Sequence, residues 1–198
     1  MNAHRTTTIL LVATLCFLTA CRASHSGPYT PQTESTRSPL QAERLTMRAL
    51  EVLDEGGDDP EGLSRAESLL REALSADLFY GPAHNNLAVV YLKQGRLYDS
   101  AAECEWARKL MPGAPDPRVN LGIVLERAGR TRDALASYRA ALEVSPEHIE
   151  AMQGLARLQL RRDRTDDETP RYLREIALRG TTPQWREWAQ SLLGRFEN

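Results

Sequence analysis

One pattern of residues occurs twice along the chain, at a spacing of 34 positions. The five matched pairs are Leu87 and Leu121, Tyr91 and Leu125, Gly95 and Gly129, Ala107 and Ala141, and Pro112 and Pro146. A period of this length is typical of chains in which a pair of helices has been duplicated and stacked. We therefore expect an array of helical hairpins, and not a globule built around a catalytic cleft.

Each copy has the features of a helical hairpin. Apolar residues three and four positions apart form two runs of about a dozen residues, as in amphipathic helices. Gly95 and Gly129 lie between the runs, where glycine can adopt the positive φ that ends a helix. Pro112 and Pro146 end the second helix, because proline lacks the N–H and clashes with the preceding turn. Small residues allow the helix axes to approach closely, and these are Ala88, Ala101, Ala107, Gly122, Ala134 and Ala141.

The two copies closely resemble the tetratricopeptide repeat. That pattern has a large residue, Leu-Gly, an aromatic residue, a turn glycine, small residues on the second helix and a closing proline. The copies depart from it at His84, Ala88, Ser100 and Cys104, and at Arg118 and Leu125. Because His84 and Arg118 replace the usual tryptophan, we expect looser packing at that corner. The resemblance implies an all-α, right-handed superhelical solenoid in which the first helix of every repeat lines a concave groove.

Weaker copies flank the clear pair, so that two clear and two degenerate repeats are predicted. They fall at about 40–80, 81–114, 115–148 and 149–181, followed by a capping helix at 182–198. In the last repeat, Asp163 takes the place of the turn glycine. Thr169-Pro170 and Thr182-Pro183 each combine an N-cap residue with a proline in the first turn, and Gly180 ends the helix between them. The apolar stripe of the capping helix consists of Trp185, Trp188, Ala189, Leu192, Leu193 and Phe196.

The N-terminus has the features of an export signal. His4 and Arg5 precede the apolar stretch 9–18, which is too short to span a bilayer. The stretch ends in Leu18-Thr19-Ala20-Cys21, which resembles the bacterial lipobox. That resemblance implies removal of residues 1–20 and diacylation of Cys21, which becomes the mature N-terminus. Ordinary cleavage near the same small residues, with Cys21 left as a plain thiol, is the alternative.

A lipid anchor and a linker follow from this arrangement. Several acyl chains together make release from a membrane negligible. In some Gram-negative bacteria, an aspartate after the cysteine is the usual signal for retention in the inner membrane. Arg22 is at this position here, so we expect the outer membrane, facing the periplasm. Residues 23–39 are rich in Ser, Thr and Pro and have few aliphatic side chains, so this segment cannot bury enough surface to order itself. As a flexible coil it spans about 20–25 Å between the lipid and the repeats.

Composition gives no support for nucleic-acid binding or catalysis. The chain has 25 basic and 27 acidic residues, which leaves no basic surplus for phosphates. After removal of the signal, the histidines are His25, His84 and His148, with no cysteine or carboxylate at ligand spacing. The acidic run 54–59 lacks the glycine and glutamate of an EF-hand loop. Cys104 has no partner for an internal disulfide and is expected to be buried. We predict no enzyme activity, cofactor, metal or small-molecule substrate.

The resemblance places the candidate binding residues on the first helices. The groove positions are Asn85, Val89, Leu92, Lys93, Val119, Ile123, Glu126, Arg127, Gln153, Arg157 and Arg161, preceded by Thr46, Leu50 and Leu53. We expect apolar anchors of a peptide to enter between Leu50 and Ile123, with an acidic group near Arg127, Arg157 or Arg161. The alternative is that the apolar positions are simply core, because adjacent first helices also pack on each other.

Three classes of function remain open. The first is an adaptor in the bacterial cell envelope that binds a peptide or protein on the groove. Lipid-anchored tetratricopeptide proteins that assist the assembly of pilus secretins are similar in plan. The second is a structural subunit that associates with itself. The third, an enzyme or a metal carrier, needs a cluster of residues that the sequence does not show.

Overall fold

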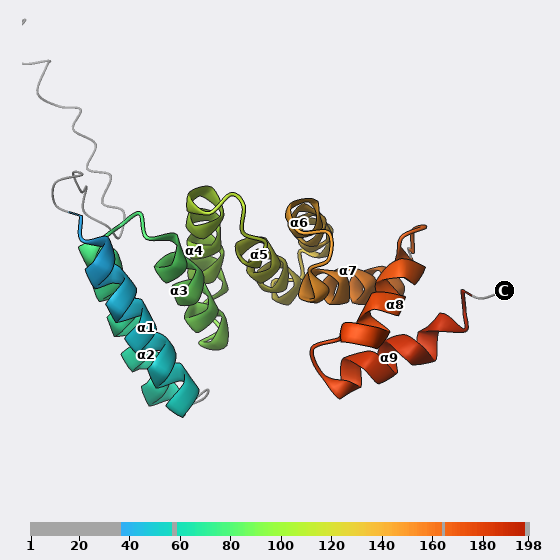
Figure 1. Ribbon diagram of the computed structural model, residues 1–198, viewed down its shortest axis with the longest axis horizontal. Helices are drawn as coiled ribbons and strands as arrows, with labels where there is room; N and C mark the ends of the chain where they lie inside the picture. The colour runs from blue at the N-terminus through green and yellow to red at the C-terminus, as the bar shows by residue number, and fades with distance from the viewer. Residues whose placement is uncertain (1–36, 57–58, 164, 197–198) are drawn as a thin grey trace, which may run out of the picture. The chain divides into compact units, whose positions relative to one another are not determined.

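The computed structural model describes residues 37–56, 59–163 and 165–196, and these residues form helices and connecting turns without a β-strand. The helices are α1 (Pro39–Gly56), α2 (Pro60–Ala76), α3 (Gly81–Lys93), α4 (Leu97–Leu110), α5 (Asp116–Arg127), α6 (Thr131–Val144), α7 (Ile149–Arg161), α8 (Thr169–Arg179) and α9 (Pro183–Leu193) (Figure 1). The predicted signal sequence 1–20 and the acylation site Cys21 lie outside the described residues.

The helices follow the predicted repeat plan. Each helix packs on the next one along the chain, and α1, α3, α5 and α7 also contact one another in succession (Figure 1). The pairs α1–α2, α3–α4, α5–α6 and α7–α8 are therefore stacked hairpins. This arrangement confirms the prediction of an all-α solenoid of helical repeats.

The turn between the two helices of a repeat keeps the period of 34 residues beyond the clear copies. Gly95 has a φ of 77° and Gly129 a φ of 75°, as the sequence predicted. Asp163, at the next equivalent position, has a φ of 49°. Aspartate tolerates this left-handed region better than most residues because its short side chain can form local hydrogen bonds. The loss of glycine therefore does not abolish the turn in the last repeat.

The two predicted N-caps near the C-terminus have different outcomes. The Oγ1 of Thr182 accepts the N–H of Trp185 at 3.4 Å and caps α9, which confirms that prediction. The prediction that Thr169 caps α8 is wrong, because Thr169 is the first residue inside the helix. Its buried Oγ1 instead donates to Gln159 Oε1 at 3.1 Å and accepts the N–H of Asp166 at 3.0 Å. Thr169 thus joins α8 to the end of α7.

Arg37, which precedes the predicted boundary at residue 40, contacts the first repeat. Arg37 donates two hydrogen bonds to the carboxylate of Asp77, at 2.8 and 3.1 Å, and the guanidinium lies 5.1 Å from the ring centroid of Phe79. Burial alone would raise the pKa of Asp77, but the bonds from Arg37 and from the N–H of Phe79 lower it below its ordinary value. The end of the predicted linker is therefore attached to the first repeat.

The core of the central repeats is built around Tyr138 on α6, which is fully buried. A Cβ added to Gly122 on α5 would lie 2.6 Å from its ring, and a Cβ added to Gly154 on α7 would lie 2.5 Å from it. The equivalent positions one repeat earlier are Ala88 and Cys104, both fully buried. The smaller Cys104 side chain leaves room for an alanine where Tyr138 requires glycine.

The corner occupied by His84 is not loosely packed, and the expectation of looser packing there is wrong. His84 is fully buried and stacks on Trp106 with 5.6 Å between the ring centroids. Its Nε2 donates to the carbonyl oxygen of Leu78 at 2.8 Å, and its Nδ1 lies 2.5 Å from Glu103 Oε2. The stacked rings and the two polar contacts therefore close this corner around the buried imidazole.

Gly122→Ala is expected to destabilise the protein by about 1–3 kcal/mol, because the added methyl group overlaps a buried ring that cannot move aside. Alanine's higher helix propensity offsets only part of this cost. Urea unfolding followed by circular dichroism measures the difference. Gly113→Ala is the matched control, since nothing lies within 4 Å of a Cβ there. Equal stability of the two variants would contradict this account of the core.

Candidate partner-binding surfaces

We call the surface formed by α1, α3, α5 and α7 the first-helix face. Three of the residues predicted to bind a partner there are part of the core instead. Leu92 is 7% exposed, Val119 is 5% exposed and Gln153 is 3% exposed. Side chains this deeply buried cannot contact a partner without unfolding, so the alternative interpretation, that first helices pack on each other, holds for these positions.

The remaining predicted residues are accessible on this face. Asn85, Val89 and Ile123 are half-buried, as are Glu126 and Arg157. The exposed positions are cationic, and they are Lys93, Arg127 and Arg161. On α1, Thr46 is buried, Leu53 is half-buried and Leu50 is 39% exposed. The face therefore has partly exposed apolar side chains next to exposed positive charges.

Two side-chain hydrogen bonds connect α3 and α5 across this face. Asn120 Nδ2 donates to Asn85 Oδ1 at 2.9 Å. Arg127 donates to the carbonyl oxygen of Leu92, in the last turn of α3, at 3.1 Å. The same carbonyl accepts the N–H of Gly95 at 3.1 Å, and a cation at this end of the helix is favoured by the helix dipole. Arg127 therefore has a structural role, while the rest of its guanidinium remains accessible.

Glu126 is the centre of the polar contacts at the C-terminal part of the face. Arg157 donates two hydrogen bonds to its carboxylate, at 2.5 and 2.7 Å, and Arg161 lies 3.5 Å from it. The hydroxyl of Tyr138 also donates to Glu126, at 3.4 Å. Burial, and then the nearby Glu126 charge, raises the pKa of Tyr138 above its ordinary value. Glu126 therefore lies beside Arg157, where the sequence analysis expected an acidic group of the partner.

Helix α9 borders the face at its C-terminal end. The guanidinium of Arg157 lies 5.9 Å from the ring centroid of Trp185, and Gln153 exchanges hydrogen bonds with Thr181 at 3.3 Å. Ala189 is buried, and the other members of the predicted stripe pack half-buried against the core. Trp185 and Trp188 meet edge to face with 5.2 Å between their ring centroids. The predicted apolar stripe of α9 therefore covers the last repeat.

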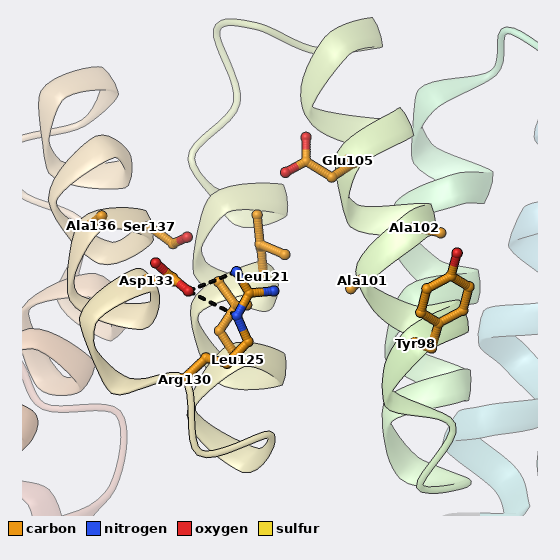
Figure 2. Close-up of a pocket in the computed structure, with 10 residues that line it drawn as sticks. All are labelled: Tyr98, Ala101, Ala102, Glu105, Leu121, Leu125, Arg130, Asp133, Ala136 and Ser137. Carbon is orange, nitrogen blue, oxygen red and sulfur yellow. Dashed lines mark hydrogen bonds and ion pairs between the residues drawn. The ribbon is translucent and has the colours of Figure 1, made fainter.

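A separate hollow of about 530 Å³ opens between the second helices α4 and α6, over α5 (Figure 2). We call it the second-helix hollow. Its lining residues are Tyr98, Ala101, Ala102, Glu105, Leu121, Leu125, Arg130, Asp133, Ala136 and Ser137. Small side chains leave the space open, and Arg130 is bonded to Asp133 at its edge (Figure 2). The sequence interpretation missed this hollow, although the alanines at 101, 102 and 136 were a visible signal.

The described residues show little that could perform chemistry. No three side chains of His, Cys, Asp or Glu within them come together in a way that could hold a metal ion. Cys104 is buried as predicted, and burial raises the pKa of its thiol to about 12, so the reactive thiolate is scarce. None of the described helices has the length and apolar character needed to cross a membrane.

Comparison with known sequences agrees with this architecture. The sequence profile of the tetratricopeptide repeat matches residues 61–115 and 119–183. The chain belongs to the tetratricopeptide repeat family. The mouse protein "Tetratricopeptide repeat protein 28" is 26% identical over 104 residues, which cover 52% of this chain. The chain spans only 4% of the length of that relative, so the match concerns the repeats alone.

Solved structures of tetratricopeptide proteins are similar in fold. The first repeat domain of Spaghetti (RPAP3), bound to an HSP90 peptide, is 16% identical with a TM-score of 0.59, over 65% of this chain and 98% of that one. MamA is 16% identical with a TM-score of 0.59, over 80% and 83% of the chains. A tetratricopeptide repeat protein from Parabacteroides merdae is 19% identical with a TM-score of 0.61, over 79% and 60%. At these identities the similarity concerns the fold.

Glu126→Gln is expected to lower the free energy of unfolding by about 1–2 kcal/mol, because the half-buried Arg157 loses its charged partner. Thermal or urea unfolding measures the change. Asp133→Asn is the control, since its pair with Arg130 is more exposed and should contribute less than about 0.5 kcal/mol. A Glu126→Gln variant as stable as the control would show that the Glu126 cluster does not stabilise the fold.

Proposed function

We propose that this protein is a membrane-anchored scaffold of the bacterial cell envelope that binds a partner protein or peptide on the first-helix face. The observation that carries the proposal is the combination, on one face of a tetratricopeptide fold, of partly exposed Val89 and Ile123 with exposed Lys93, Arg127 and Arg161. Apolar anchors contribute most of the affinity in such contacts, and peripheral charges add specificity.

The accessible residues define the kind of partner. An apolar side chain of the partner packs on Val89 and Ile123, which lie on adjacent helices. An acidic group meets Arg127 or Arg161, because Arg157 is already occupied by Glu126. The RPAP3 domain, which has the same fold, binds an HSP90 peptide. That structure supports peptide binding as a use of this fold, without indicating which partner this chain binds.

The membrane anchor in this proposal depends on the N-terminal sequence. The apolar stretch 9–18 followed by Leu18-Thr19-Ala20-Cys21 supports export and acylation at Cys21. With Arg22 after the cysteine, the proposed location is the outer membrane, facing the periplasm. The linker would then hold the first repeat near the lipid surface while leaving the first-helix face accessible to proteins of the same compartment.

A second candidate function is a structural subunit that associates with copies of itself. The second-helix hollow favours it, because an apolar floor between α4 and α6 could receive an exposed side chain such as Leu40, which is 70% exposed on α1. Light scattering of the full chain over a range of concentrations separates the two candidates. An adaptor stays monomeric, whereas a structural subunit grows in mass with concentration.

The double variant Val89→Asp/Ile123→Asp is expected to abolish capture of the partner while leaving helicity intact, because two charges replace the apolar anchors. The measurement is photo-crosslinking in living cells from probes on the first-helix face, followed by identification of the crosslinked protein. Circular dichroism verifies that the variant is folded.

Leu178→Asp is the matched control for this experiment. Leu178 is 75% exposed on α8, a second helix, so a charge there should leave capture unchanged. Unchanged capture by the folded double variant, or equal loss in the control, would remove the first-helix face as the binding surface.

Cys21→Ser is expected to move the protein from the membrane fraction to the soluble fraction of the envelope, since the acyl chains supply the membrane affinity. Fractionation followed by immunoblotting measures the distribution, and mass spectrometry of the wild-type protein should show a diacylated N-terminal Cys21. Cys104→Ser is the control, because Cys104 is buried in the repeats. A mature wild-type chain that begins at another residue would disprove the anchor.

A further inference from the structure

One edge of the first two repeats is formed by helix ends and by the connections between repeats. The helices of a hairpin run antiparallel, so the start of α1 and the end of α2 lie at the same edge as the start of α3 and the end of α4 (Figure 1). The N–H of Ser38 donates to the carbonyl oxygen of Ala76 at 2.8 Å. A Cβ added to Gly81 would lie 2.6 Å from Met111 Cγ. The residues that precede α1 in the sequence therefore join the repeats at this edge.

Three large apolar side chains are exposed at this edge. Leu40, in the first turn of α1, is 70% exposed, and Phe79, between α2 and α3, is 42% exposed. Trp106, one turn before the end of α4, is 39% exposed. Together with the neighbouring cations Arg37 and Lys109, we call these residues the entry patch. Exposed apolar groups that gather in one place indicate a surface that another partner covers.

Each aromatic ring of the entry patch has a cation beside it. The guanidinium of Arg37 lies 5.1 Å from the ring centroid of Phe79. The Nζ atom of Lys109 lies 5.8 Å from the ring centroid of Trp106. Aromatic rings with adjacent Arg or Lys side chains are typical of protein surfaces at the boundary between lipid and water, where the ring meets the acyl chains and the cation meets the headgroups.

The two rings belong to one connected structure. Trp106 stacks on the buried ring of His84, with 5.6 Å between the centroids. The Nε2 of His84 donates to the carbonyl oxygen of Leu78 at 2.8 Å, and Leu78 directly precedes Phe79. The end of α4 is thus joined through His84 to the connection that carries Phe79. The exposed rings are therefore held on ordered backbone at the same edge.

Charge alone does not explain what covers the entry patch. Asp77 is bonded to Arg37, and Glu43 and Glu72 are exposed on the neighbouring parts of α1 and α2. The edge therefore has no large excess of positive charge. Attraction to this surface has to come mainly from the burial of apolar side chains, which depends little on salt.

The proposed acylation site lies close to the entry patch along the chain. Residues 22–36, which are 15 residues, separate Cys21 from Arg37. A coil of this length has an end-to-end distance of about 20 Å. Acyl chains on Cys21 would therefore keep Arg37, and with it the ring of Phe79, near the headgroups at all times. A surface held this close to lipid meets it at a high effective concentration.

We infer that the entry patch rests on the lipid surface in which the acylated Cys21 is anchored, with Leu40, Phe79 and Trp106 among the headgroups. This inference rests on the membrane anchor of the proposed function. It gives the first two repeats a defined orientation, in which the entry patch faces the membrane and the turn 94–96, at the other end of α3 and α4, faces away from it.

The test places the acylated full chain on vesicles of equal parts phosphatidylcholine and phosphatidylglycerol, with brominated phosphatidylcholine as the quencher of a fluorescent thiol label. Gly113→Cys carries the label just after α4, at the edge with the entry patch, where nothing lies within 4 Å of a Cβ. Tyr98→Cys carries it at the opposite end of α4, at a position that is 88% exposed. Cys104 is buried and should not take the label.

The label at position 113 is expected to be quenched severalfold more than the label at position 98, with little change when salt is added. Equal quenching at the two positions, or no quenching at position 113, would overturn the inference. A change in the label at position 113 when protein concentration rises without vesicles would mean that a second copy covers the entry patch, and would overturn it as well.

Charged substitutions in the entry patch provide the second measurement. Leu40→Asp/Phe79→Asp should lower the quenching at position 113 severalfold, and Leu40→Asp alone should lower it less, while the acyl chains keep both variants on the vesicles. Tyr98→Asp is the matched control, because it places the same charge at an exposed ring on the opposite edge. Circular dichroism verifies folding. Wild-type quenching in the folded double variant, or an equal loss in the control, would overturn the inference.

The same samples separate this inference from the proposed anchor. If the chain sediments with the vesicles but the label at position 113 stays in water, the anchor stands and the inference fails. If mass spectrometry shows no acyl group on Cys21, the anchor itself fails, and the inference fails with it.

Discussion

The packing of Tyr138 between Gly122 and Gly154 is the constraint on which the arrangement of the central repeats depends. A methyl group at either glycine would overlap the buried ring, so the closeness of α5, α6 and α7 is set by the absence of two side chains. Close helices bring the first-helix positions of neighbouring repeats side by side. The same packing places the Tyr138 hydroxyl next to Glu126, which connects the core to the charged surface.

The charged side chains of the first-helix face form two groups. One group is bonded within the protein, and the other is exposed to a partner. Glu126 bonds to Arg157 and to the Tyr138 hydroxyl in a compact group, and Trp185 borders it. Arg127 and Arg161 lie beside this group and are exposed. Exposed cations of this kind attract an acidic partner. The half-buried Val89 and Ile123 supply the apolar contact that charge alone cannot provide.

The proposed lipid anchor and the repeats have complementary physical roles. In the proposed function, acyl chains fix the protein to a membrane without specifying a partner, and the repeats supply the contacts with the partner. Arg37 is bonded to Asp77, so the residues directly before α1 are attached to the first repeat.

The sequence by itself determined the features that depend on local interactions and on repetition. The period of 34 residues predicted the stacked hairpins, Gly95 and Gly129 predicted the turns with positive φ, and Thr182-Pro183 predicted the start of α9. Each of these is set within a few residues along the chain, where steric and hydrogen-bonding rules act directly. The resemblance also predicted a binding groove on the first helices, but it could not separate the buried Leu92 and Val119 from the accessible Val89 and Ile123.

Only the tertiary structure decided which distant side chains meet. His84 bonds to Glu103, 19 residues away, and Glu126 bonds to Arg157, 31 residues away, and neither pairing has a signal in the local pattern. The second-helix hollow likewise exists because α4 and α6 are held apart over α5, which no single helix specifies. The physical reason is that burial and pairing depend on the distance between helices, and that distance is set by the packing of side chains such as Tyr138 from several repeats at once.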